Sequence, residues 1–157
     1  MIEPAIITLN GALLCGTSAP MSLHSFTPWT LWPKLMPRIH TIQNRTNSDL
    51  LSLRVFDRVP IFSPEANPSF TYWACMEVLG HNEGFEHLEF QGGRYAVFHY
   101  KGRSTDPSIW RYIYGTWIPS SPWELDDRPH FERLGAAYKN DDPVSEEHIY
   151  IPIRARR

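Results

Sequence analysis

The sequence predicts an α+β fold, in which two repeated β-α-β-β units form one antiparallel sheet with two helices and a central ligand groove. Two segments have apolar residues at helical spacing, and short apolar runs bounded by turn residues surround them. The order strand, helix, strand, strand occurs twice. We therefore expect residues 1-157 to form a single domain with pseudo-repeats at about 5-80 and 86-154. This symmetry rests on layout, because no sequence repeat accompanies it.

The first unit opens with a strand from Ala5 to Gly16 that breaks at Asn10-Gly11. A helix follows from about Thr30 to Ile42. With Thr30 as the N-cap, Pro33 falls in the first turn, where its missing backbone donor has no partner to lose, whereas Pro37 should kink the helix. The apolar face of this helix consists of Trp32, Leu35, Met36 and Ile39.

Two strands complete the first unit. Leu50 to Asp57 alternates between two faces, as a strand with one buried side does. Val59 to Ser69 contains three prolines and is expected to be a loop. Phe70 to Leu79 is a nearly continuous apolar run, which indicates a strand buried on both faces.

The second unit repeats this order. His87 to Tyr100 is expected to be a long strand with a bend at Gly92-Gly93. Asp106 can cap a helix that has Pro107 at its first position and ends at Pro119. Its apolar face consists of Ile109, Trp110, Ile113, Tyr114 and Trp117. The last two strands of the unit are predicted at Phe131 to Tyr138 and at Glu146 to Ile153, with a loop over Ser120 to Pro129 before them.

Composition excludes several classes of protein. The 157 residues are 42% hydrophobic and 20% charged, which is typical of a globular domain and not of a disordered or membrane chain. The net charge of -2 gives no support to a nucleic-acid-binding surface, which is usually basic. No signal peptide is visible, so we expect a soluble cytoplasmic protein.

Metal and cofactor motifs are missing from the sequence. The two cysteines and seven histidines have no ligand spacing, and neither a phosphate-binding glycine loop nor a nucleophile elbow is present. We therefore expect no cofactor and no metal. The aromatic fraction of 13% is high, which suggests that some rings line a ligand cavity as well as filling the core.

Two glutamates are the candidate charged groups of such a cavity. Glu132 follows Phe131 in a short predicted strand and shares a face with Leu134. Aromatic rings and a carboxylate both attract positive charge, so this setting suits a hydrophobic cation. Glu77 lies in an apolar strand on the face of Trp73 and Cys75, as a second anionic group or as a structural partner of a base. For Glu132, the residues alone favour an exposed strand glutamate paired with a nearby base.

Four motifs in order resemble the gyrase-inhibitor-like family of effector-binding domains, which also includes AraC-type regulators. They are Tyr72 through Val78, Gly93-x-Tyr95-Ala96-Val97-Phe98 with Lys101-Gly102, Trp110 through Pro119, and Phe131-Glu132 with the closing Tyr150-x-Pro152-Ile153. The resemblance implies two αβ units around a hydrophobic groove, where an acidic residue matching Glu132 binds lipophilic cations. For Glu132, this resemblance favours a carboxylate in the ligand groove over an exposed strand glutamate.

By the same analogy, four rings are expected near the ligand: Tyr72, Tyr114, Trp117 and Tyr150. Leu134 departs from the family pattern, because an aromatic residue is expected two positions after the glutamate. The chain has no room for the DNA-reading helix-turn-helix that many relatives carry, so it resembles a stand-alone multidrug-binding member.

The leading functional hypothesis is a non-catalytic module that binds lipophilic cationic small molecules, for sensing or for sequestration. Its context would be a transcription regulator partner or a homodimer, with no direct nucleic-acid or membrane binding. One alternative is a hydrolase of strained electrophilic natural products, with Glu132 as general acid or base and Tyr150 or Tyr114 assisting. Another is a protein that modulates gyrase or the transcription machinery. Haem binding, known for the similar SOUL-like fold, lacks a convincing axial residue, with His99 the only guess.

Overall fold

Residues 2–157 are described by a computed structural model. The helical and extended elements are β1 (Ala5–Leu9), β2 (Ala12–Ser22), η1 (Pro28–Thr30), α1 (Trp32–Leu35), η2 (Met36–Thr41), β3 (Leu50–Phe56), β4 (Ser69–Val78), β5 (Glu86–Phe90), β6 (Gly93–Lys101), α2 (Ser108–Tyr112), η3 (Ile113–Trp117), α3 (Ile118–Ser120), β7 (Trp123–Leu125), β8 (His130–Leu134) and β9 (Glu146–Ala155). Among these residues no helix has the length and apolar character needed to cross a bilayer.

All the strand pairings are antiparallel, and the sheet has the order β1-β6-β9-β8-β3-β4-β2-β5, with the short β7 paired to β9. The strand order is symmetric. Read inward from its two ends, it meets corresponding strands of the two units in the same sequence: β1 and β5, β6 and β2, β9 and β4, then β8 and β3. The two halves meet where β3 pairs with β8. The predicted α+β class, with one large antiparallel sheet and two helices, is confirmed.

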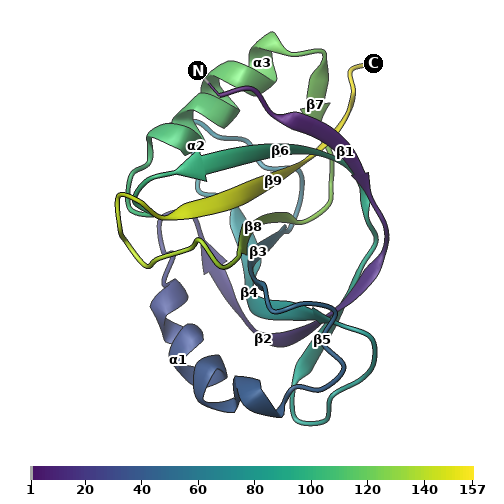
Figure 1. Ribbon diagram of the computed structural model, residues 1–157. Coiled ribbons are helices and arrows are strands. Elements are labelled where there is room, and N and C mark those ends of the chain that lie inside the picture. Colours follow the sequence, from purple (N-terminus) through teal and green to yellow (C-terminus); the bar gives the residue numbers. More distant parts are fainter. Residues whose placement is uncertain (1) are drawn as a thin grey trace.

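The sheet curls strongly because its two outer strands continue into strands near the opposite end of the order. β1 runs into β2 and β5 runs into β6, each through a two-residue bend (Figure 1). At the second bend Gly92 has φ +77°, and a side chain there would collide with the carbonyl oxygen of Leu9. The predicted breaks at Asn10-Gly11 and Gly92-Gly93 are therefore both confirmed.

The first helical segment runs through η1, α1 and η2 and changes from α to 3-10 geometry at Met36. Pro37 follows at once, and proline cannot donate the next α-helical hydrogen bond, so the disturbance expected at Pro37 takes the form of this change to 3-10 geometry. The expected cap is wrong: Thr30 ends η1, and the N-cap position of α1 is Leu31, which makes no side-chain cap. Met36, placed on the apolar face by its spacing, is 45% exposed.

The second helical segment runs through α2, η3 and α3, with a wider π-helical turn at Ile113–Trp117. Asp106 caps it as predicted, since its Oδ1 accepts the Ser108 N–H at 2.9 Å. Two later boundaries differ from the prediction. β8 ends at Leu134 because a turn closes there, with Tyr138 N–H donating to Gly135 O at 3.1 Å. β7 lies within the predicted loop from Ser120 to Pro129, because a strand of three residues is too short to show a sequence period.

Both helical segments lie on the outside of the curled sheet (Figure 1), and we call that side the helical face. The opposite, concave side is the inner face. One apolar cluster lies under each helical segment, around Phe70 and Met76 in the first half and around Phe98 and Ile151 in the second. A third cluster, which includes Leu53 and Phe131, fills the inner face.

Candidate functional site

The centre of the helical face is built by the β3–β8 pairing. Ser52 lies opposite Glu132 and Arg54 lies opposite His130. Successive side chains of a strand point to opposite faces, so these four all point toward the helical side, whereas Leu51, Leu53, Phe131 and Arg133 point to the inner face. Polar groups thus gather where the two halves of the molecule meet.

Arg54 is enclosed by rings and by one carboxylate. Its Nη1 lies 3.2 Å from Glu132 Oε2, and the two side chains are only 14% and 10% exposed. The guanidinium carbon lies 4.7 Å from the ring centroid of Phe26, 5.4 Å from that of Trp110 and 5.9 Å from that of Phe70. We call Glu132 and these three rings the cation cage. Burial is the largest single influence and lowers the pKa of Arg54. The charge of Glu132, the smaller electrostatic effects of Tyr72 and Tyr114 and the hydrogen bond to Glu132 together outweigh it, so the pKa is raised.

A second carboxyl adjoins the cage. Glu147 of β9 is 8% exposed, as is Glu132. Ile149 is the direct partner of Glu132, so Glu147 lies diagonal to Glu132 on the same face. Burial, and then the charge of Glu132, raises the pKa of Glu147 to about 8, although Arg54 acts in the opposite direction. At neutral pH Glu147 is therefore mostly protonated beside the Glu132 carboxylate, which pairs with Arg54.

On the first half of the face, hydroxyl groups occupy the corresponding region. Tyr72 Oη lies 2.7 Å from Ser52 Oγ and accepts a hydrogen bond from Trp32 Nε1 at 3.0 Å. Burial raises the pKa of Tyr72 to about 12, so the phenol stays neutral. Its ring also packs edge-on against Phe26 at 5.2 Å, which joins Tyr72 to the cation cage.

Tyr114 and His130 form the side of the cage nearest the second helical segment. Tyr114 Oη lies 2.8 Å from His130 Nδ1, and Phe62 stacks on the Tyr114 ring at 4.0 Å. Burial, followed by the charges of Arg54 and Arg128, lowers the pKa of His130 to about 3. A neutral imidazole therefore faces the cage at any pH near 7.

The six residues predicted to contact a ligand are divided between different places. Glu132, Tyr72 and Tyr114 come together on the helical face. Glu77 and Tyr150 belong to the inner face, where Tyr150 stacks on Phe131 at 4.4 Å. Trp117 is 9% exposed and packs edge-on against Phe98 at 5.2 Å in the second apolar cluster. A ligand role for each of the six stays a prediction.

Three residues of this site were not predicted from the sequence: Arg54, His130 and Glu147. One signal was available for Arg54, since it is the only charged residue within the apolar β3 segment. The other two lie in polar sequence, next to Arg128-Pro129 and Glu146, and nothing local distinguishes them from surface residues. Their burial follows from how β8 and β9 pack under the second helical segment.

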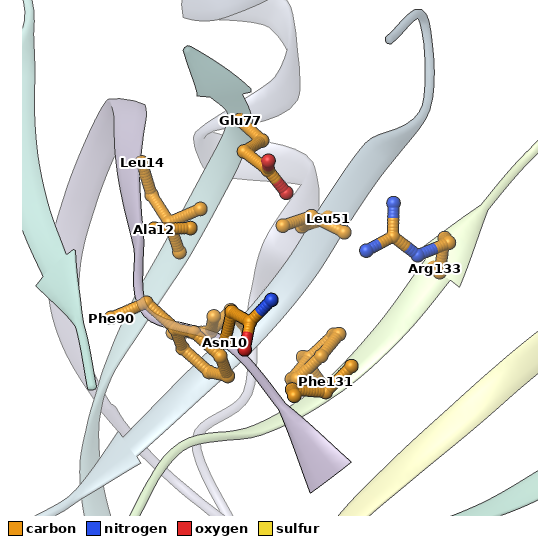
Figure 2. A pocket seen from close by; sticks show the side chains of 10 residues that line it. Asn10, Ala12, Leu14, Leu51, Glu77, Phe90, Phe131 and Arg133 are labelled. Carbon is orange, nitrogen blue, oxygen red and sulfur yellow. The ribbon is translucent and has the colours of Figure 1, made fainter. Parts of the chain in front are cut away.

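A cavity of about 50 Å³ opens on the inner face, between β2, β3, β4 and β8 (Figure 2). Glu77 and Arg133 lie at its edge over an apolar floor that includes Leu51 and Phe131. This cavity is separate from the cation cage, because alternate residues of the same strands line the two. The interior of the cage itself is occupied by the Arg54 side chain.

Comparison with known proteins identifies the family. The model of the GyrI-like small molecule binding domain matches residues 30–154. No curated protein matches the sequence. Among solved structures, an integron cassette protein from Vibrio cholerae has a TM-score of 0.65 at 16% identity, over 97% of this chain and 96% of its own.

Two further structures share the fold. A putative transcription regulation protein from Staphylococcus aureus has a TM-score of 0.65 at 14% identity, over 99% of this chain and 100% of its own. SAV2435, solved with tetraphenylphosphonium bound, has a TM-score of 0.69 at 14% identity, over 97% of this chain and 94% of its own. At identities this low, the structural similarity shows a common fold. The match to the family model extends over most of the chain. The protein therefore belongs to the GyrI-like family of small-molecule binding domains.

Proposed function

We propose that this protein binds lipophilic organic cations in the cation cage. One observation carries the proposal: the cage already holds a cation, the guanidinium of Arg54, between the Glu132 carboxylate and the faces of Phe26 and Trp110. Each favourable contact between a cation and a ring is worth about 0.5–2 kcal/mol. Rings and carboxylate together attract positive charge without fixing the shape of its carrier.

Arg54 makes binding a replacement reaction. An incoming cation takes the place of the guanidinium beside Glu132, and the long Arg54 side chain moves to solvent, where its charge is hydrated. The free energy of binding is reduced by the interactions that Arg54 loses. Only ligands with more apolar surface than a guanidinium compensate for that loss, so the proposal favours bulky lipophilic cations over small hydrophilic ones. SAV2435, which shares this fold, has been solved with such a cation bound.

Glu147 is a second acidic group beside the cage. Its pKa is raised to about 8 by burial and by the charge of Glu132, although Arg54 acts in the opposite direction. A bound cation takes over the positive charge that Arg54 supplies, so binding should leave the protonation of Glu147 nearly unchanged. Affinity for the cation should therefore vary little between pH 6 and pH 8.

The test is a fluorescence titration with a lipophilic cationic dye and a neutral dye of similar shape. It uses the wild type, Glu132→Gln, Glu77→Gln and a control, Glu89→Gln, whose carboxylate is exposed on β5. We expect saturable binding of the cationic dye, weak binding of the neutral dye, and at least a roughly ten-fold loss of affinity in Glu132→Gln, as for a lost charge-assisted hydrogen bond. Glu89→Gln should bind as the wild type does.

Equal binding of the two dyes by every variant would overturn the proposal. A loss of affinity in Glu77→Gln with none in Glu132→Gln would also overturn it, because the cation would then bind on the inner face.

A second candidate is hydrolysis of a strained electrophile in the same cage, favoured by two neighbouring buried carboxyl groups. Because the pKa of Glu147 is raised to about 8, Glu147 holds a proton at pH 7 and can donate it to a leaving group, while the Glu132 carboxylate that pairs with Arg54 orients the attacking water and accepts a proton from it. Product formation from a cyclopropane-bearing electrophile, lost in Glu147→Gln while dye binding persists, would support it. Stable binding without product would exclude it for the compound tested.

A further inference from the structure

The inner-face cavity has the form of a small amphipathic site. Its volume is about 50 Å³, and its floor includes Leu14, Leu51 and Phe131. Three polar side chains reach the edge of this floor: Asn10, Glu77 and Arg133 (Figure 2). A cavity needs about 10–15 Å³ to hold one buried water, so this cavity has room for roughly four waters or for an organic molecule of alanine to valine size.

The two charged groups of the cavity are not paired with each other. Glu77 makes no salt bridge within residues 2–157, and its carboxylate accepts no hydrogen bond from them. Arg133 pairs with Asp49 through Nη1 at 3.4 Å, and its guanidinium carbon lies 5.7 Å from the Tyr150 ring centroid. The remaining nitrogen atoms of Arg133 make no hydrogen bond to the described part of the chain. The Glu77 carboxylate and the Arg133 guanidinium can therefore each form further hydrogen bonds with a ligand.

The sheet fixes the distance between these charges. Arg133 of β8 lies directly opposite Leu51 of β3, and Leu51 lies opposite Cys75 of β4, two residues from Glu77. The two charged residues thus flank β3 at two strand spacings across the sheet and two residues along it, about 12 Å between their backbones. The long side chains of Glu77 and Arg133 shorten this separation, and one small molecule that carries both an ammonium group and a carboxylate can bridge the remaining gap, through charge-assisted hydrogen bonds of about 2.8 Å.

We propose that this cavity binds a small zwitterion with a short apolar side chain, namely an α-amino acid of alanine to valine size. The ammonium group donates to Glu77, the carboxylate accepts from Arg133, and the apolar side chain packs on Leu51 and Phe131. Asn10 contributes an amide that can donate to or accept from either end. A simple cation would leave the remaining nitrogen atoms of Arg133 without an acceptor, and a simple anion would leave the Glu77 carboxylate without a donor, so both charges of the ligand are required.

This site is independent of the cation cage. Ser52 and Arg54 point to the helical face while Leu51 points to the inner face, and the sheet separates the two ligands. Failure of dye binding in the cage would leave the amino-acid site unaffected, and the reverse also holds.

The test is a two-dimensional NMR titration with L-valine, isobutylamine and isobutyrate, which share an isopropyl group and differ in their charged groups. The proteins are the wild type, Glu77→Gln, Arg133→Gln, Ala12→Leu and the exposed control Glu89→Gln. Ala12 lines the cavity, so a leucine there fills it without changing a charge. We expect L-valine to shift the amide signals of Leu51 and Phe131 in a saturable way, with each charge variant and the filled variant weakening binding at least roughly ten-fold.

Isobutylamine and isobutyrate should each bind at least roughly ten-fold more weakly than L-valine, and Glu89→Gln should match the wild type. The proposal is overturned if L-valine causes no saturable shifts at these amides, or if either single-charge analogue binds as tightly as L-valine. Unchanged affinity in Ala12→Leu would also overturn it, provided that its spectrum shows a folded protein.

Discussion

The two faces of the β3–β8 strand pair are opposites in chemistry although alternate residues of the same two strands form both. On the helical face, Arg54 and Glu132 form a pair enclosed by rings, and a protonated Glu147 lies beside them. On the inner face, Leu53 and Phe131 are almost fully buried in an apolar cluster. The charged residues that line its cavity are Glu77 and Arg133, at the edge.

The difference shows how one small sheet divides stability from recognition. Apolar packing on the inner face needs no partner of defined charge, so it stabilises the fold under all conditions. The cage keeps ionisable groups away from water, which costs stability but leaves a surface that responds to a cation. Four changes would break or sharpen this contrast, and they are given from the largest expected effect to the smallest.

Removal of the central ring of the inner face should have the largest effect. Phe131 stacks on Tyr150 at 4.4 Å and meets Phe90 and Tyr95 edge-on at 5.6 Å each. Phe131→Ala should lower the free energy of unfolding by about 3–5 kcal/mol, as measured by urea denaturation. Trp110→Ala is the comparison from the cage and should cost less, because Trp110 is only partly buried. Equal losses would mean that the two faces do not divide these roles.

Removal of the internal cation should affect stability and binding in opposite directions. Arg54→Met leaves Glu132 without its partner, so the free protein should lose about 2–3 kcal/mol of unfolding free energy. The same variant should bind a lipophilic cation at least roughly ten-fold more tightly, since no guanidinium has to be replaced. Thermal unfolding with and without the dye measures both. An affinity equal to that of the wild type would show that Arg54 does not compete with the ligand.

Stability should fall between pH 6.5 and pH 8 because of Glu147. Its pKa is raised to about 8, so in this range the folded state holds a proton that the unfolded state has released. Stability therefore decreases as the pH rises through the window, by up to about 2 kcal/mol at 1.4 kcal/mol for each pH unit. Urea denaturation at pH 6.5 and pH 8 measures the slope.

Two variants assign the pH effects. Glu147→Gln should remove the decrease between pH 6.5 and pH 8. His130 acts only at lower pH: its pKa is lowered to about 3, so the stability that it contributes is present above pH 6.5 and is lost as the pH falls toward 3. A decrease above pH 6.5 that persists in Glu147→Gln would contradict this assignment.

The smallest effect is expected for the inner-face carboxylate. Glu77 is partly exposed and makes no salt bridge within the described residues, so Glu77→Gln should change the free energy of unfolding by less than about 0.5 kcal/mol. Denaturation in urea beside Glu89→Gln measures it. A loss above about 1 kcal/mol would mean that Glu77 has a structural partner and that the inner edge is not a free charged rim.

The order of elements was predictable from local pattern. The period of β3, the apolar run of β4, the glycine bend before β6 and the Asp106 cap all act within a few residues, so the sequence predicts them correctly. Boundaries that depend on partners were not predictable. β7 exists because it pairs with the end of β9, and β8 is short because a turn follows Leu134.

The sequence by itself determined the α+β layout and the family, and through the family resemblance it pointed to Glu132 as the acidic residue of a hydrophobic groove. Only the tertiary structure decided that this carboxylate is buried and which groups surround it. Arg54 is 78 residues away from Glu132 along the chain and meets it through a strand pairing that no local pattern encodes. The registers of β4 and β9 in the same sheet put Glu77 and Tyr150 on the opposite face, because the register of a strand decides which side each residue occupies. Local periodicity gives the elements, whereas long-range register gives the site.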